Sequence, residues 1–274
     1  MIPRAHITAW RASAPWPQDE QVEQDLVLSR ALAAIFGRPS LRGALAFRGG
    51  TALHKLHFDP PGRYSEDLDL VQVEAGPIGP VLAELREALD PWLGIPAWEQ
   101  RADSVKLLYR FETTTLPVQR MRVRVEINTR EHFSVDGLQH VPFIVASPWH
   151  SADERVTTFT LEELLATKMR ALFQRRKGRD LYDLWLGLTT RDPDEAHIIE
   201  CLGEYLARTG IAISRAEFEA NMAGKLASSD FRADVTPLLR DPAGYDVDDA
   251  ATLVHDRLIA RLPGESWKAL GRER

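Results

Sequence analysis

The sequence predicts an α/β (α+β) protein in which a small mixed sheet with flanking helices is followed by a helical C-terminal domain. Three observations support this prediction. Residues 44–128 contain short apolar runs and one strongly alternating segment, which are typical of strands. Past Trp149 the composition turns helical. A boundary between Pro148 and Thr160 separates the two parts, and we place the domains at residues 1–155 and 156–274.

Composition excludes several classes of protein. The chain has 274 residues, of which 44% are hydrophobic and 27% charged, values that exclude wholesale disorder. A net charge of −6 excludes a broadly basic coat for nucleic acid. The single cysteine, Cys201, excludes a disulfide framework and Cys-based zinc sites. We find no signal peptide and no run of membrane-spanning length, so we expect no membrane association and a cytoplasmic protein.

The first predicted elements are helices. Residues 18–36 carry apolar side chains at helical spacing and end at Gly37 and Pro39. Residues 80–93 carry a second apolar stripe, disturbed at its end by Pro91 and Gly94. The region that contains His132, His140 and His150 is expected to form loops, and no histidine spacing is typical of a zinc site.

A glycine turn lies between these two helices. Gly49 and Gly50 follow an apolar run, residues 44–47, and precede a predicted helix. Free backbone N–H groups and the positive end of the helix would then face an anion, and Thr51 adds a hydroxyl. The turn therefore predicts a phosphate site.

An acidic segment follows the turn. If residues 64–71 form a strand, Ser65, Asp67 and Asp69 point to the same face. Neighbouring carboxylates repel each other, and hard oxygen ligands at this spacing suit Mg²⁺. Each feature alone is usually a plain turn or a solvated strand end. Together they follow the order in which the phosphates and the metal of a nucleotide would be met.

Two further segments, residues 104–112 and 118–128, are predicted to pair as strands. The second alternates between an apolar face and a charged face that carries Arg120, Arg122, Arg124 and Glu126. An edge strand with a solvated face would show the same pattern. One acid among arginines also suits a third metal ligand, Glu126, beside groups that neutralise phosphate.

The helical half contains a second charged cluster. A capping-box pattern at Thr160 and Glu163 predicts a helix to about Gln174, and residues 194–207 and 216–226 read as later helices. Lys168 either snorkels to solvent or contacts a nucleotide phosphate. Asp180 or Asp183 is then a surface ion-pair partner, a base or the group that fixes the lysine. The basic link between the two helices is a candidate RNA-binding segment, comprising Arg175, Arg176, Lys177 and Arg179.

These motifs resemble a known family. The segments Phe47-Arg48-Gly49-Gly50-Thr51-Ala52-Leu53-His54-Lys55 and Arg63-Tyr64-Ser65-Glu66-Asp67-Leu68-Asp69, with Lys168 and the run from Arg179 to Leu184, are similar to the AbiEii/AbiGii toxins. That family belongs to the nucleotidyltransferases of the DNA polymerase β type and includes the MenT-like tRNA-modifying toxins. The similarity extends from about Gln18 to Asp183.

The resemblance implies a nucleotidyltransferase fold, with the active site in a cleft between the domains. It also implies attack of a hydroxyl on the α-phosphate of a nucleoside triphosphate, with release of pyrophosphate. Asp67, Asp69 and Glu126 would hold Mg²⁺, or alternatively Mn²⁺. Glu stands where related enzymes often have Asp, and Thr51 where many have Ser. The implied nucleotide-binding residues are Arg48, Gly49, Gly50, Thr51, Ser65 and Lys168, and the implied catalytic residues are Asp67, Asp69, Glu126, Lys168 and Asp180.

By the same resemblance, the substrate is CTP or another pyrimidine triphosphate, and the acceptor is the tRNA 3′ end or another RNA. A cognate antitoxin is the expected protein partner. The sequence leaves the oligomeric state open and is compatible with a monomer. Two alternatives stay open: the same chemistry on a small molecule or protein, and a catalytically inactive module that binds RNA or nucleotide. We predict from the sequence that Asp67→Ala and Lys168→Ala each abolish toxicity without unfolding the protein.

Overall fold

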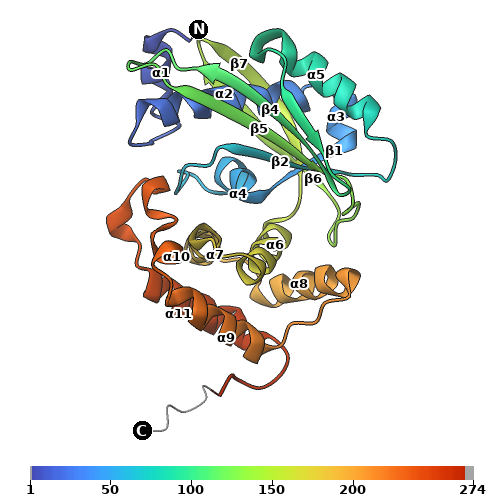
Figure 1. Cartoon of the computed structure of the whole chain (residues 1–274), viewed down its shortest axis with the longest axis vertical. Helices are drawn as coiled ribbons and strands as arrows, with labels where there is room; N and C mark the ends of the chain where they lie inside the picture. The colour runs from blue at the N-terminus through green and yellow to red at the C-terminus, as the bar shows by residue number, and fades with distance from the viewer. Residues whose placement is uncertain (1, 269–274) are drawn as a thin grey trace. The chain divides into compact units, whose positions relative to one another are not determined.

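The computed structural model describes residues 2–268 and divides into two compact units, residues 1–160 and 161–274. Unit 1 is a mixed sheet with helices, and unit 2 is helical (Figure 1). The predicted fold class is therefore confirmed. The predicted boundary at residue 155 falls inside strand β7, so the division lies slightly later in the chain.

Unit 1 is built on a seven-stranded sheet within the described residues, in the order β3-β4-β5-β2-β1-β7-β6. The β1–β2, β3–β4, β4–β5 and β6–β7 pairs are antiparallel, whereas β2–β5 and β1–β7 are parallel. The strands are β1 (Leu45–Arg48), β2 (Asp67–Gln72), β3 (Ala97–Gln100), β4 (Ser104–Glu112), β5 (Arg120–Asn128), β6 (Gln139–Ser147) and β7 (His150–Thr158). The helices are α1 (Arg4–Trp10), α2 (Asp19–Phe36), α3 (Pro39–Ala44), α4 (Gly49–Ala52), the π-helix η1 (Leu53–His57) and α5 (Gly79–Leu93).

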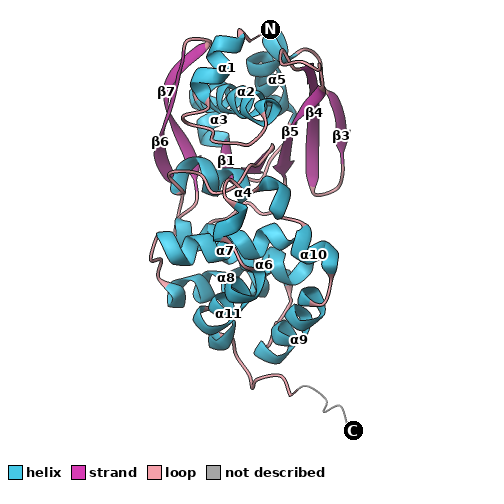
Figure 2. Ribbon diagram, turned by 90° about the vertical axis from the view of Figure 1, so that its left-hand side faces the viewer, coloured by secondary structure: helices cyan, strands magenta, loops and turns pink. Residues whose placement is uncertain are grey.

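Helix α2 forms the centre of unit 1. Figure 2 shows it with β6 and β7 on one side and β3, β4 and β5 on the other. Leu26, Leu32 and Phe36 on this helix are fully buried. Burial of each such side chain contributes about 1.5–3 kcal/mol to folding.

The predicted pairing of β4 with β5 is confirmed, and so is the inward face of β5, where Val123, Val125 and Ile127 are fully buried. The expected loop region was wrong, because His140 lies in β6 and His150 begins β7. Strands β6 and β7 pair along their whole lengths. Long-range pairing satisfies their backbone groups although β7 begins with polar and charged residues. Helix α1 and the exposed edge strand β3 were also absent from the prediction.

Unit 2 contains α6 (Leu161–Gln174), α7 (Gly178–Thr190), α8 (Glu195–Thr209), α9 (Arg215–Leu226), α10 (Ser229–Ala233) and α11 (Val247–Arg257), with short 3₁₀ turns between them. The predicted helices that became α6 to α9 are confirmed. Gly187 of α7 lies against Leu165 of α6, where an added Cβ would come within 2.9 Å of a leucine methyl carbon. Glycine thus allows the two helices to approach closely. Among residues 2–268, no helix combines the length and apolar character needed to cross a membrane.

Candidate active site

Two acidic side chains lie on the central strand β2. Asp67 and Asp69 are two residues apart and so share a face of the sheet. Asp69 is in register with Arg48 on β1 and with Glu126 on β5, and Asp67 is in register with Arg124. The structure thus brings the three predicted metal ligands together on two adjacent strands. All three are half-buried.

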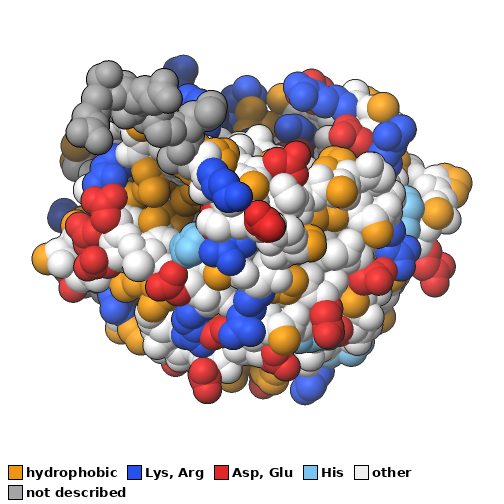
Figure 3. All heavy atoms as spheres, turned by 90° about the horizontal axis from the view of Figure 1, so that it is seen from below, with side chains coloured by type: hydrophobic (Ala, Val, Ile, Leu, Met, Phe, Trp, Pro, Cys, Tyr) orange, Lys and Arg blue, Asp and Glu red, His pale blue; other side chains and the backbone are white. Residues whose placement is uncertain are grey.

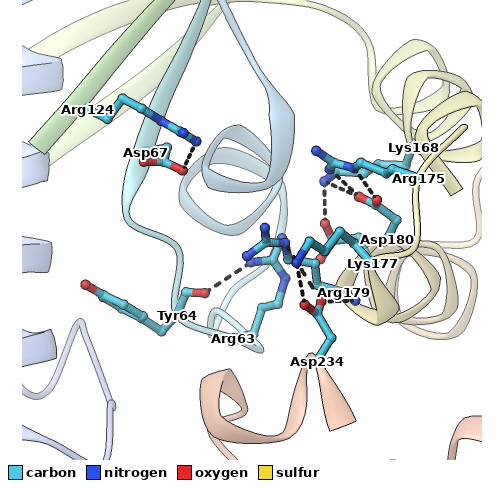
Figure 4. A network of polar contacts seen from close by, with 11 residues as sticks. Arg63, Tyr64, Asp67, Arg124, Lys168, Arg175, Lys177, Arg179, Asp180 and Asp234 are labelled. Carbon is cyan, nitrogen blue, oxygen red and sulfur yellow. Dashed lines mark hydrogen bonds and ion pairs between the residues drawn. The ribbon is translucent and has the colours of Figure 1, made fainter. Parts of the chain in front are cut away.

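Basic side chains accompany these acids. Arg124 forms an ion pair with Asp67, and its Nε lies 3.9 Å from Glu126 Oε2 (Figure 4). Lys106 Nζ on β4 lies 3.1 Å from Glu126 Oε1. Burial raises the pKa of Asp67 above its usual range, and the Arg124 charge opposes that rise. Lys106 was missed from the sequence because its pairing with Glu126 depends on the register between β4 and β5.

The glycine turn lies directly against the acidic strand. Gly49 has φ +82°, and a Cβ built there would overlap Asp69 Oδ2. Only glycine meets both requirements. Helix α4 begins at this turn, as predicted, and among the described residues no side chain caps its N-terminus. Its first backbone N–H groups are therefore donors suited to a phosphate.

Thr51 and Ser65 connect the turn to the acidic strand. Strand β2 begins only at Asp67, so the prediction of a strand from residue 64 was wrong, and Ser65 precedes the strand. The hydroxyls of Thr51 and Ser65 are 2.8 Å apart, and Thr51 also donates to the backbone carbonyl of Asp67. Thr51 is 1% exposed. Both hydroxyls hold the turn against β2, a role that sequence reasoning did not assign to them.

Arg48, the last residue of β1, forms an ion pair with Glu131 at 2.5 Å. Both side chains are one-fifth exposed. Glu131 follows β5, and the sequence offers no local signal for this contact. Arg48 is therefore held by Glu131 at a position that is in register with Asp69 on the neighbouring strand.

The donor set fits a hard divalent cation. Three carboxylates on adjacent strands offer only oxygen ligands, which suit Mg²⁺ or Mn²⁺. Among the described residues these oxygens do not all lie within 4.8 Å of one another. Asp67 and Glu126 instead point to Arg124 and Lys106. A metal held by these three residues would have to replace these ion pairs through side-chain rotations.

Unit 2 holds a second, buried cluster. Lys168 Nζ lies 3.1 Å from Asp180 Oδ1 and 2.8 Å from Asp183 Oδ2. Lys168 is 5% exposed, and both aspartates are 0% exposed. The alternative of a lysine that reaches solvent and makes surface ion pairs is therefore wrong, because all three side chains are buried. Charges buried this deeply must be paired.

Arg175 completes the cluster. Its Nε and Nη2 donate to both oxygens of Asp180 at 2.7 and 2.8 Å (Figure 4). Burial alone would raise the pKa of Asp180, but Lys168 and Arg175 hold it below its usual range. A carboxylate with a lowered pKa is a poor general base. The geometry favours Asp180, together with Asp183, as the groups that fix Lys168.

The basic link is largely neutralised within unit 2. Lys177 Nζ lies 3.3 Å from Asp234, which also accepts a hydrogen bond from the Arg179 backbone (Figure 4). Gly178 lies so close to Phe231 that a Cβ would overlap its carbonyl oxygen. On the face shown in Figure 3, acidic and basic side chains are interspersed, without one large basic area. Among the predicted RNA-binding residues, Arg175 and Arg176 are exposed.

Comparison with known proteins assigns the family. Residues 30–253 match the family described as nucleotidyl transferase AbiEii toxin of type IV toxin–antitoxin systems. The chain belongs to the AbiEii family. Membership confirms the predicted family and implies a cognate antitoxin. No curated protein matches the sequence.

Solved structures share the fold at low sequence identity. MenT4, a nucleotidyltransferase toxin from Mycobacterium tuberculosis, aligns with a TM-score of 0.68 at 17% identity, covering 96% of this chain and 91% of its own. JHP933 from Helicobacter pylori aligns with a TM-score of 0.52 at 15% identity, covering 89% and 95%. A putative nucleotidyltransferase from H. pylori gives 0.51 at 15% identity, covering 90% and 100%. At this identity the likeness establishes the fold of the AbiEii chain.

Proposed function

We propose that this AbiEii protein transfers a nucleoside monophosphate from a nucleoside triphosphate to an RNA acceptor in the cytoplasm, and that the acceptor is the tRNA 3′ end. The modification would block translation. One observation carries the proposal: the strand register aligns Asp69 with Glu126, with Asp67 two residues along β2 and Gly49 against Asp69. Family membership supports the chemistry.

The proposed roles follow from position. The N–H groups at the start of α4 bind the triphosphate, and Gly49 lets the phosphate oxygens approach the acidic strand. Asp67, Asp69 and Glu126 would hold Mg²⁺ or Mn²⁺. When bound, the metal neutralises phosphate charge and lowers the pKa of an attacking hydroxyl.

Basic side chains near the three acids supply further positive charge. Arg124 and Lys106, which pair with Asp67 and Glu126, would neutralise charge on the phosphates. Arg48 lies in register with Asp69 and adds a third positive charge. In unit 2, Asp180 and Asp183 fix the buried Lys168, the residue that the family resemblance assigns to nucleotide binding.

A labelling experiment tests the function. Purified protein is incubated with Mg²⁺, total tRNA and each of the four α-³²P-labelled nucleoside triphosphates in turn. We expect label on tRNA, with CTP or UTP as the best donor, and no label with Asp69→Asn. Absence of label on every RNA would refute an RNA acceptor.

A second acceptor class is tested in parallel reactions that contain a protein mixture or an aminoglycoside in place of tRNA. Pairing of Lys177 and Arg179 with Asp234 reduces the positive charge available to RNA, which favours a protein or small-molecule acceptor. Label on protein or on an aminoglycoside, with none on RNA, would support that candidate. Nucleotide binding without transfer to any acceptor would support an inactive binding module.

A further inference from the structure

Helix α2 buries three consecutive polar residues, which is unusual in the central helix of a core. Glu23, Gln24 and Asp25 are 1%, 1% and 5% exposed. Burial of polar groups is costly unless each finds hydrogen-bond partners. Each of these side chains contacts a different segment next to the candidate active site.

Asp25 contacts the helix that follows the glycine turn. Lys55 of η1 donates from Nζ to Asp25 Oδ1 at 3.0 Å and to Ser29 Oγ at 2.9 Å. The side chains of Lys55 and Asp25 are 10% and 7% exposed. Asp25 also accepts from the indole nitrogens of Trp10 and Trp16, at 2.9 and 3.2 Å. The carboxylate is therefore fixed from several directions, and it fixes Lys55 in turn.

Gln24 contacts the segment that leads into the acidic strand. Its Oε1 accepts from the Tyr64 hydroxyl, three residues before Asp67. Its Nε2 donates to the backbone carbonyl of Arg122 on β5 at 2.6 Å. Burial raises the pKa of Tyr64, which keeps the phenol protonated and able to donate. Gln24 thus links the lead into β2 to β5, the two strands that carry the three acids.

Glu23 contacts the loop before β5. It accepts from the backbone N–H of Thr114 at 2.9 and 3.0 Å. The loop enters the strand that carries Glu126. Residues 23–25 of α2 therefore contact three segments: the helix after the glycine turn, the lead into β2 and the loop before β5.

A pocket beside the glycine turn includes the Asp25–Lys55 pair in its wall. This pocket, of about 460 Å³ in unit 1, is lined by Asp25, Ser29, Lys55, Thr51 and Ser65, among others. The turn helix also packs through the buried Ala52 and Leu53. The ion pair adds a polar link between α2 and the turn helix at the side where the pocket leaves space.

We propose that Asp25 and Lys55, with Gln24, are positioning residues that hold the glycine turn and strand β2 in the geometry needed for nucleotide binding. The inference rests on the proposed nucleotidyltransferase function. None of the three side chains is assigned a contact with substrate or metal. They act through Gly49, Thr51 and Asp67.

Lys55→Met tests the proposal, because it removes the charge and keeps most of the side-chain volume. We expect the KM for the nucleoside triphosphate to rise about tenfold or more. We also expect backbone hydrogen exchange in residues 49–57 to accelerate by about tenfold, because the turn helix loses its anchor. Lys55→Arg keeps the cation and should stay near wild type in both measurements.

Two further variants separate positioning from stability. Asp25→Asn combined with Lys55→Met removes both charges together, so no unpaired charge stays buried, and its Tm should approach that of wild type. Its KM should stay high. Tyr109→Phe, which removes a hydrogen bond to Asp90 elsewhere in unit 1, is the matched control and should leave KM unchanged. Wild-type KM and exchange in Lys55→Met, or recovery of both in the double variant, would overturn the proposal.

Failure of the proposed function gives a different result. Calorimetric titration with Mg²⁺ and nucleoside triphosphate measures binding without transfer. If wild type binds nucleotide but labels no acceptor, transfer is refuted, while weaker binding by Lys55→Met still supports positioning. Equal binding by both proteins would refute positioning even if wild type transfers label.

Discussion

At the scale of single residues, the candidate site is a balance of opposite charges on neighbouring strands. Asp67 lies beside Arg124, and Glu126 beside Lys106, so two of the three acids proposed to bind a metal have these basic partners in the structure. Such pairs are half-exposed and contribute little to stability. In the proposed function, these pairs place positive charge next to the phosphate oxygens of the nucleotide.

Asp67→Ala should abolish transfer and leave the fold intact. We expect label transfer to fall by about a thousandfold, because a metal ligand is lost, and Tm to change little, because burial already disfavours this carboxylate. Glu66→Ala removes the same charge from the neighbouring residue, which precedes β2 and lies 3.9 Å from Arg122, and is the control. Transfer at wild-type rate by Asp67→Ala would exclude it as a metal ligand.

Gly49→Ala should impair both folding and activity. Its φ of +82° costs a residue with a Cβ about 1–2 kcal/mol, and the methyl group would also displace the Asp69 carboxylate. We expect a lower Tm and a loss of transfer of about a hundredfold. Gly76→Ala, where an added Cβ meets nothing within 4 Å, is the control. Equal behaviour of the two variants would show that the turn tolerates a side chain.

At the scale of elements, helices α6 and α7 are joined by buried charges. Lys168 of α6 is bonded to Asp180 and Asp183 of α7, and Lys225 of α9 donates to the Phe173 carbonyl at 2.9 Å and to that of Leu172. Burial lowers the pKa of Lys225 to about 8. The motif that resembles a catalytic one therefore also holds α6 against α7, and Lys225 joins α9 to α6.

Lys168→Ala should destabilise the protein as well as reduce its toxicity. The sequence alone predicts that this variant keeps its fold, but loss of one partner of a buried ion pair typically costs about 3–5 kcal/mol. Chemical denaturation measures this loss, with Lys177→Ala on the exposed link as the control, which we expect to cost less than about 1 kcal/mol. A stable Lys168→Ala protein without activity would assign the lysine to catalysis alone.

Acid should weaken the α6–α7 pairing. The pKa of Asp180 is lower in the folded state than in the unfolded chain, so its ionised form stabilises folding above about pH 4. That contribution is lost as pH falls through the folded-state pKa. Thermal unfolding between pH 3 and pH 7 should show a smaller acid-induced loss of stability for Asp180→Asn than for wild type. Asp230→Asn, on the surface, should follow wild type.

At the scale of the whole molecule, metal binding should couple to stability and activity together. Chelation should abolish transfer, and added Mg²⁺ or Mn²⁺ should restore it. A ligand at about 100 times its Kd stabilises the folded state by about 2.7 kcal/mol, so Mn²⁺ should raise the Tm of wild type. The Tm of a double Asp67→Asn, Asp69→Asn variant should not respond. Full activity in excess chelator would refute metal dependence.

The fold class, the α6–α9 helices and the motifs that carry the family resemblance could be predicted from the sequence alone. These features are local: alternation along β5, the apolar stripe of α2 and glycines at a turn are each visible within about twenty residues. The spacing of Asp67 and Asp69 also fixes their common face once the segment is a strand.

The contacts that these residues make with one another are visible only in the tertiary structure. Register placed Asp69 opposite Glu126 and Lys106 beside it, because strand pairing joins residues far apart in sequence. The sequence left open whether Lys168 reaches solvent, and the structure shows it buried and paired with Asp180 and Asp183. The roles of the buried polar residues of α2 could not be predicted either. The hydrogen bond between Gln24 and Tyr64 and the ion pair between Asp25 and Lys55 form only when α2 packs in the folded unit.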